Sequence, residues 1–257
     1  MKKTIIILTV LMILHSIVLY TFNLQETIFG RVIGFEHGIL LLVGTIFSLL
    51  ALKNLSGKIK TVGRIHVVTL MSFAVSMIVW AYYAVATGVE SPYPSISDVF
   101  FALGTIALTI TLFVIAYIYK SSITKARLWS SIILGLVAGF GMYLLTGAPE
   151  LTDTTSFVTT AFDVFWGLSA AITSAVAVTV MRLVGGQIYR GMFVLTLAVL
   201  VKAVADVLFT IRVAEGIYWN GDISDILYVI AWGMLAYTVL ELPKYVSGGN
   251  KSEQVNI

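Results

Sequence analysis

Five carboxylates and one lysine lie inside, or at the edge of, long apolar segments of this sequence. Charged groups within a bilayer are costly, so they pair with each other, bind an ion or ligand, or carry protons. A carboxylate held at low dielectric binds protons more readily, and its negative charge attracts cations and basic small molecules. The six residues predicted to bind a ligand or ion are Glu36, Asp98, Asp163, Lys202, Asp206 and Asp225.

Asp98 and Asp225 each end an Ile-Ser-Asp triplet at the start of an apolar segment. In the first turn of a helix, a carboxylate accepts hydrogen bonds from free backbone N–H groups and interacts favourably with the helix dipole. Helix capping is therefore an alternative explanation for both residues.

Lys202 and Asp206 are four residues apart, a spacing at which opposite charges pair on one helix face. Such a pair is either purely structural or part of a site. Glu36 and Asp163 lie too deep in their segments for simple capping, and neither has a partner in its own segment. We therefore expect a binding or inter-helix role for both acids. Glu36 could reach Lys202, the one cation well inside an apolar segment.

Three aromatic residues near these acids are predicted to line a pocket: Trp80, Tyr83 and Trp166. The alternative is the belt of Trp and Tyr that membrane proteins place at both interfaces with water.

Several chemistries are excluded or disfavoured. The chain has no cysteine, and its three histidines, His15, His37 and His66, show no ligand spacing, so no metal or other cofactor is predicted. Lys202 does not fit a retinal Schiff base, because microbial rhodopsins keep that lysine in the last helix with an acid four residues before it. The Tyr-Asp and Gly-x-Gly-Asp signatures of intramembrane aspartyl proteases are absent. No catalytic residue is predicted.

Composition indicates that lipid is the main solvent of this chain. Of its 257 residues 59% are hydrophobic and 11% are charged, and the mean hydropathy is +0.98. Soluble domains average roughly 25% charged residues. The basic pI near 9.0 does not require a nucleic-acid partner, because membrane proteins concentrate Lys and Arg on one side.

Apolar windows predict an all-α, polytopic membrane protein with eight spans of about 20 residues each. The basic, apolar N-terminus is expected to be a retained first span rather than a cleaved signal peptide. The predicted spans are 4–22, 31–52, 63–86, 97–119, 128–147, 156–181, 190–213 and 223–242.

The charges in the connections predict the orientation. Alternate connections hold nearly all of the Lys and Arg. The others hold only Arg31 and Arg212 as basic residues, together with the acids Glu26, Glu90, Glu150, Asp153, Glu215 and Asp222. The positive-inside rule then places both termini in the cytoplasm and all five carboxylates in the outer half of a plasma membrane. The basic side carries Lys2, Lys3, Lys53, Lys58, Lys60, Arg64, Lys120, Lys125, Arg127, Arg182, Arg190, Lys244 and Lys251.

An internal duplication is predicted from an offset of 127 residues. At this offset Ser97-Asp98 superposes on Ser224-Asp225, and Phe35-Glu36 on Phe162-Asp163. Four spans in each copy would give two parallel repeats, related by an axis along the membrane normal. The predicted organisation is a first repeat at 1–122, a second at 123–243 and a short polar tail at 244–257.

The stretch YPSISDVFFALG resembles a motif in the multi-span membrane sensor regions fused to bacterial and archaeal histidine kinases and diguanylate cyclases. The motif reads approximately Tyr-Pro-Ser-x-x-Asp-x-x-(Phe/Tyr)-x-x-Gly, often with a degenerate later copy. The matching residues are Tyr93, Pro94, Ser95, Asp98, Phe101 and Gly104, with Asp222, Asp225 and Tyr228 in the second copy. The resemblance implies a sensor module. Because no kinase or cyclase sequence follows residue 243, we expect the module to act with a separate cytoplasmic signalling protein.

The sequence thus predicts a non-enzymatic sensor or ligand-binding module in the bilayer, with an outward-facing acidic pocket for a cation or a small basic molecule. A transporter coupled to protons or cations is the main alternative, and an intramembrane enzyme is a more distant one.

Overall fold

A computed structural model describes residues 1–24, 27–88, 92–118, 129–130, 132–133, 154–183 and 189–242, and these residues contain helices but no strand. The elements are α1 (Lys2–Phe22), α2 (Ile28–Arg31), α3 (Ile33–Ala51), the short 3₁₀ helix η1 (Leu52–Asn54), α4 (Gly57–Thr87), α5 (Ile96–Ile118), α7 (Thr154–Leu183), α8 (Tyr189–Ala214) and α9 (Ile223–Glu241).

Seven of these helices are long and apolar enough to cross a membrane, which indicates a membrane-embedded, multi-pass protein. They correspond to seven of the eight predicted spans. The predicted span at 128–147 lies almost wholly outside the described residues, and the predicted tail at 244–257 lies entirely outside them.

One boundary differs clearly from its prediction. Helix α4 begins at Gly57, six residues before the predicted start at 63. Lys58 and Lys60 lie in this extension. A hydropathy window detects apolar residues only, so it misses helical residues that are charged. The last turn of α4 ends at Gly88, whose φ of 70° is a left-handed conformation that glycine adopts without strain.

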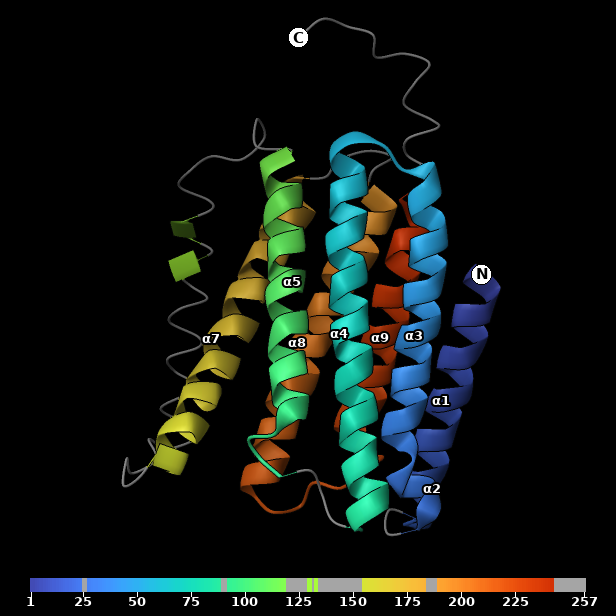
Figure 1. The fold of residues 1–257 in the computed structure, drawn as a ribbon, viewed down its shortest axis with the longest axis vertical. Coiled ribbons are helices and arrows are strands. Elements are labelled where there is room, and N and C mark those ends of the chain that lie inside the picture. The colour runs from blue at the N-terminus through green and yellow to red at the C-terminus, as the bar shows by residue number, and fades with distance from the viewer. Residues whose placement is uncertain are drawn as a thin grey trace, which may run out of the picture.

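The helices pack as a bundle in which α9 has the most interior position (Figure 1). Helix α9 packs against α1, α3 and α8, and α5 packs between α4 and α7. Helix α3 also packs against α4, and α7 against α8. In its most apolar window α9 is 61% buried, whereas α1 is 22% buried and lies at the periphery.

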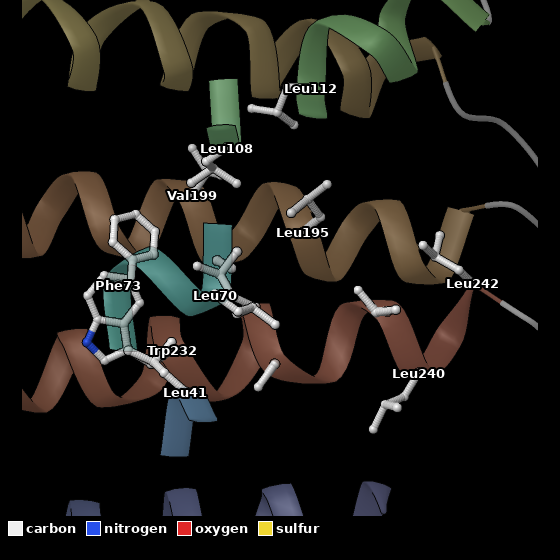
Figure 2. Packing of buried hydrophobic residues seen from close by; sticks show 14 of the residues in the cluster. Leu41, Leu70, Phe73, Leu108, Leu112, Leu195, Val199, Trp232, Leu240 and Leu242 are labelled. Atoms are coloured by element: carbon white, nitrogen blue, oxygen red, sulfur yellow. The ribbon is translucent and has the colours of Figure 1, made fainter. Parts of the chain in front are cut away.

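The core is formed where five helices meet (Figure 2). Leu41 of α3, Phe73 of α4, Leu108 of α5, Val199 of α8 and Trp232 of α9 are all buried there. The ring centroids of Phe73 and Trp232 are 4.7 Å apart. In a bilayer the surrounding lipid is as apolar as this core, so close packing and hydrogen bonds, rather than hydrophobic burial, hold the helices together.

Small residues allow two of these helix pairs to approach closely. A β-carbon added at Gly44 of α3 would lie 2.5 Å from the Ala236 β-carbon of α9, and one added at Gly104 of α5 would lie 2.6 Å from the Phe73 ring of α4. Real β-carbons essentially never come this close to other atoms, so both positions require glycine at the observed helix spacing.

Candidate functional site

One end of the bundle, the lower end in Figure 1, carries the described residues between α4 and α5 (88 and 92–95) and the α8–α9 connection (215–222). We call it the acidic end, because carboxylates outnumber cations there among the described residues. The acids are Glu36, Asp98, Asp163, Asp206, Glu215, Asp222 and Asp225, and the cations are Arg31, Lys202 and Arg212.

An ion pair between a buried lysine and a half-buried aspartate lies on α8, facing α9. Lys202 Nζ donates to both carboxylate oxygens of Asp206, at 2.9 and 2.8 Å, which confirms the pairing predicted from their spacing. The Tyr228 hydroxyl of α9 donates to Asp206 Oδ1 at 2.7 Å. We call these three residues the Lys202 cluster. The side chains of Lys202 and Asp206 are 10% and 26% exposed, so the lysine is the more enclosed partner.

Aromatic rings enclose the lysine side of the cluster. Lys202 Nζ lies 5.8 Å from the centroid of the Phe73 ring, within the range of a cation–π interaction. Tyr228 stacks on Trp232 at 5.7 Å with an interplanar angle of 11°. These rings place the ion pair in a setting of low dielectric, where its electrostatic interaction is stronger than in water.

A small, partly open cavity with a mostly apolar lining adjoins the cluster between α5, α7 and α8. Its volume is about 10 Å³ when measured as the space open to the centre of a water molecule, which is room for about one water. The lining residues are Thr105, Leu108, Ala170, Thr173, Ser174, Val199, Lys202, Ala203 and Asp206.

Asp163 lies at the edge of the acidic end, where α7 meets the start of α5. The Tyr93 hydroxyl donates to Asp163 Oδ1 at 2.6 Å. Partial burial raises the pKa of the Tyr93 phenol, and the hydrogen bond to Asp163 raises it further. Tyr93 therefore remains a proton donor to this carboxylate near neutral pH.

One face of α7 connects the two groups. Residues three and four apart share a helix face, so Asp163, Trp166, Ala170 and Ser174 form a continuous stripe about 16 Å long. Ala170 and Ser174 line the cavity beside the Lys202 cluster. We call this stripe the α7 face. It leads from the edge of the acidic end to the cavity beside the ion pair.

Asp98 and Asp225 are both hydrogen-bonded to the backbone just before their helices. Asp98 Oδ2 accepts from Ser95 N–H at 2.7 Å and from the Ser95 hydroxyl at 3.0 Å. Asp225 Oδ2 accepts from Gly221 N–H at 2.6 Å. The contact of Asp98 with Ser95, the residue directly before α5, is the one that the capping alternative predicts, whereas Asp225 bonds to Gly221, one residue before the N-cap Asp222 of α9. The ligand-binding role of these two acids stays a prediction.

Replacing Asp98 with alanine is expected to destabilise the protein by about 1 kcal/mol, because the Ser95 N–H and hydroxyl at the start of α5 lose their acceptor. Asn at the same position keeps an oxygen acceptor and should recover part of the loss. Thermal unfolding of the purified protein measures both effects. The matched control is Val99→Ala, at an exposed neighbouring position. Equal stability of wild type and Asp98→Ala would contradict the capping role.

Glu36 pairs with His15 of α1 and not with Lys202. The distance from His15 Nδ1 to Glu36 Oε2 is 2.9 Å. His15 lies about as many residues before the connection that follows α1 as Glu36 lies after it, and helices α1 and α3 are antiparallel, so the two side chains reach the same level. This spacing can be read in the sequence. Since the contacts of α7 are with α5 and α8, Glu36 and Asp163 belong to different helix interfaces.

The three predicted pocket aromatics occupy different places. Trp166 lies in the α7 face beside Tyr93. Trp80 donates to Asn220 Oδ1 at 3.4 Å and meets the edge of Phe209, whereas the Tyr83 ring packs against its neighbour Tyr82. Trp80 and Tyr83 are not among the residues that line the cavity beside the Lys202 cluster.

A second ion pair at the acidic end was not predicted. Arg212, at the end of α8, pairs with Asp222, the buried N-cap residue of α9, and so joins the two ends of the α8–α9 connection. Within the described ranges, no group of three or more His, Asp or Glu residues is arranged to hold a metal ion.

Comparisons with protein-family models, with curated protein sequences and with solved structures find no match to this chain.

Proposed function

We propose that this protein is an integral membrane sensor module that binds a cation or a small basic molecule at its acidic end. The observation that carries the proposal is the α7 face, which runs from the Asp163 carboxylate at the edge to the cavity beside the Lys202–Asp206 pair. Carboxylates outnumber cations at this end of the described bundle, so its electrostatic potential favours the approach of positive ligands.

The proposed orientation has both termini in the cytoplasm and the acidic end outside, in a plasma membrane. It rests on the distribution of Lys and Arg between the two sets of connections. An eighth span at 128–147 belongs to this proposal, because an even number of spans places both termini on the same side.

The proposed architecture is two parallel four-helix repeats. Helix α3 packs on α4 and α9, and α7 packs on α8 and α5, while α4 packs on α5 and α8 packs on α9. Exchanging α3, α4 and α5 for α7, α8 and α9 leaves this set of helix pairs unchanged, which supports a duplication with two-fold symmetry. The offset of 127 residues equates the same helices.

The proposed signal is a change in the position of α7. A ligand shifts a conformational equilibrium only by binding one state more tightly than the other. Helix α7 is 28% buried in its most apolar window, and it contacts the α4–α5 connection through the hydrogen bond from Tyr93 to Asp163. A cation at Asp163 would compete for this carboxylate and alter the contact between α5 and α7. A separate cytoplasmic protein would then read the movement at the opposite end.

Thermal unfolding in the presence of defined probes tests this proposal. The probes are Na⁺, K⁺, Mg²⁺, Ca²⁺ and ethanolamine, added at constant ionic strength to the full chain in nanodiscs. At least one probe is expected to raise the unfolding temperature saturably. Asp163→Asn should weaken its apparent affinity roughly tenfold, because about 1.4 kcal/mol of charge interaction is lost. Asn retains an acceptor for Tyr93, so the local hydrogen bond persists.

The matched control is Glu36→Gln, which removes a carboxylate of the acidic end that lies outside the α7 face. Its probe affinity should equal that of wild type. No saturable shift with any probe, or equal losses in the two variants, would overturn the proposal. Uptake of the active probe into proteoliposomes separates sensing from transport, because accumulation of the probe would support the transporter instead.

A further inference from the structure

Two hydroxyl groups beside the Lys202 cluster have no hydrogen-bond partner among the described residues. They are Thr105 Oγ1 of α5 and Ser174 Oγ of α7, and both residues line the cavity that Lys202 and Asp206 also line. Thr105 is 4% exposed, so bulk solvent does not supply its partner.

Other threonines of the same helix behave differently. The hydroxyl of Thr109 bonds to the Thr105 carbonyl at 2.8 Å, and that of Thr111 bonds to the Ala107 carbonyl at 2.9 Å. This bond to the carbonyl four residues back is the common arrangement for Ser and Thr in membrane helices. A buried hydroxyl without any partner is destabilising, which makes the Thr105 hydroxyl an exception that requires an explanation.

The volume of the cavity and the opposite charges of Lys202 and Asp206 limit what can bind there. About 10 Å³ open to a water centre is room for one water, and a buried water needs two to four polar partners. Thr105, Ser174, Lys202 and Asp206 supply four. A cation would lie beside the Lys202 ammonium and an anion beside the Asp206 carboxylate, whereas a neutral molecule that both donates and accepts suits all four groups.

We propose that this cavity holds a single resident water, bound by the Thr105 and Ser174 hydroxyls and by the Lys202–Asp206 pair. The water joins α5, α7 and α8, and through the Tyr228 hydroxyl the network continues to α9. The inference does not depend on the proposed ligand, because the four polar groups are part of the protein itself.

The water also provides a route for coupling across the bundle. Thr173, another residue of the cavity wall, hydrogen-bonds through its hydroxyl to Thr109 of α5 at 2.6 Å. Movement of α7 relative to α5 would therefore disturb the hydrogen bonds of the cavity wall and the surroundings of the ion pair together.

Solid-state NMR of the full chain in lipid bilayers tests the site directly, by magnetisation transfer from water to the Lys202 ammonium. Wild type should show transfer from a long-lived bound water. In the Thr105→Val, Ser174→Ala double variant it should fall roughly threefold, since two of the four partners are lost. Thr111→Val, a matched substitution on the same helix, should leave it unchanged. Absence of transfer in wild type, or equal transfer in the double variant, would overturn the inference.

The sign of a stability change gives an independent test. Val has nearly the shape of Thr, so Thr105→Val would raise the unfolding temperature if the hydroxyl had no partner. A resident water reverses this expectation, and the temperature should fall by roughly 2–4 °C. Thr105→Ser keeps the hydroxyl and should retain the magnetisation transfer to Lys202. An unfolding temperature of Thr105→Val equal to or above that of wild type would refute the water site.

Discussion

Replacing Lys202 with methionine is expected to destabilise the folded protein by about 3 kcal/mol, because the Asp206 carboxyl group would be left in the bundle without its cation. The Tyr228 hydroxyl would remain as one donor, and Asp206 is 26% exposed, so the loss falls at the lower end of the range for broken buried pairs. Unfolding in a denaturing detergent, followed by tryptophan fluorescence, measures the change.

The double variant Lys202→Met, Asp206→Leu should recover most of this stability. Replacing both members of a buried ion pair with apolar residues removes the cost of burying either charge, and such replacements are often neutral. Lys58→Met is the control, because Lys58 is exposed on α4, where its ammonium lies 6.0 Å from the Tyr117 ring. A double variant as unstable as the single one would show that the cost of Lys202→Met comes from lost packing and not from an unpaired carboxylate.

Replacing Gly104 with alanine is expected to destabilise the bundle by about 2 kcal/mol through overpacking of α5 against α4. The new β-carbon would lie 2.6 Å from two atoms of the Phe73 ring. Phe73 is fully buried and packs against Trp232 and Phe101, so its ring cannot move aside without disturbing the core. The helices must then separate, which weakens the packing that holds a membrane bundle together.

A double-mutant cycle with Phe73→Leu identifies the cause. If the ring is the obstacle, Gly104→Ala should cost less in the Phe73→Leu background than in wild type. Leu103→Ala provides a control on the same turn, since Leu103 is 48% exposed and faces away from this contact. Equal costs of Gly104→Ala in both backgrounds would contradict a steric conflict with Phe73.

The membrane-spanning segments are the part of the fold that the sequence predicts best. The backbone N–H and C=O groups of a span must be hydrogen-bonded within a helix, and its side chains facing lipid must be apolar. A long apolar segment of the sequence indicates both. The seven described spans therefore begin and end close to their predicted limits, apart from the charged start of α4.

Partners of the acids are predicted most directly where they are local. The Lys202–Asp206 pair follows from a spacing of four residues, and the contacts of Asp98 with Ser95 follow from the chemistry of a helix start. In contrast, the contact of Asp163 with Tyr93 spans 70 residues, because it depends on which helices are neighbours in the bundle. Hydropathy carries no information about that order.

The remaining contacts of the site depend on how neighbouring helices pack against each other. Tyr228 matches the resembled motif, but its role beside Asp206 depends on how α9 slides and rotates against α8. The cavity beside Thr105 is equally invisible in the sequence, since it arises where side chains of three helices fail to fill the space between them. An arrangement of this kind follows from packing and not from composition.

The interior position of α9 has a consequence for biogenesis. Helix α9 is the last described helix of the chain, yet it supplies the packing surface for α1 and α3, and its Glu241 pairs with Lys2 near the other end of the sequence. During synthesis α1 and α3 are inserted before α9. Until α9 is present, their packing surfaces for it, including Gly44 of α3, would face lipid. Neighbouring pairs such as α3–α4 and α4–α5 can pack before then, so we expect the contacts of α9 with α1 and α3 to complete the bundle last.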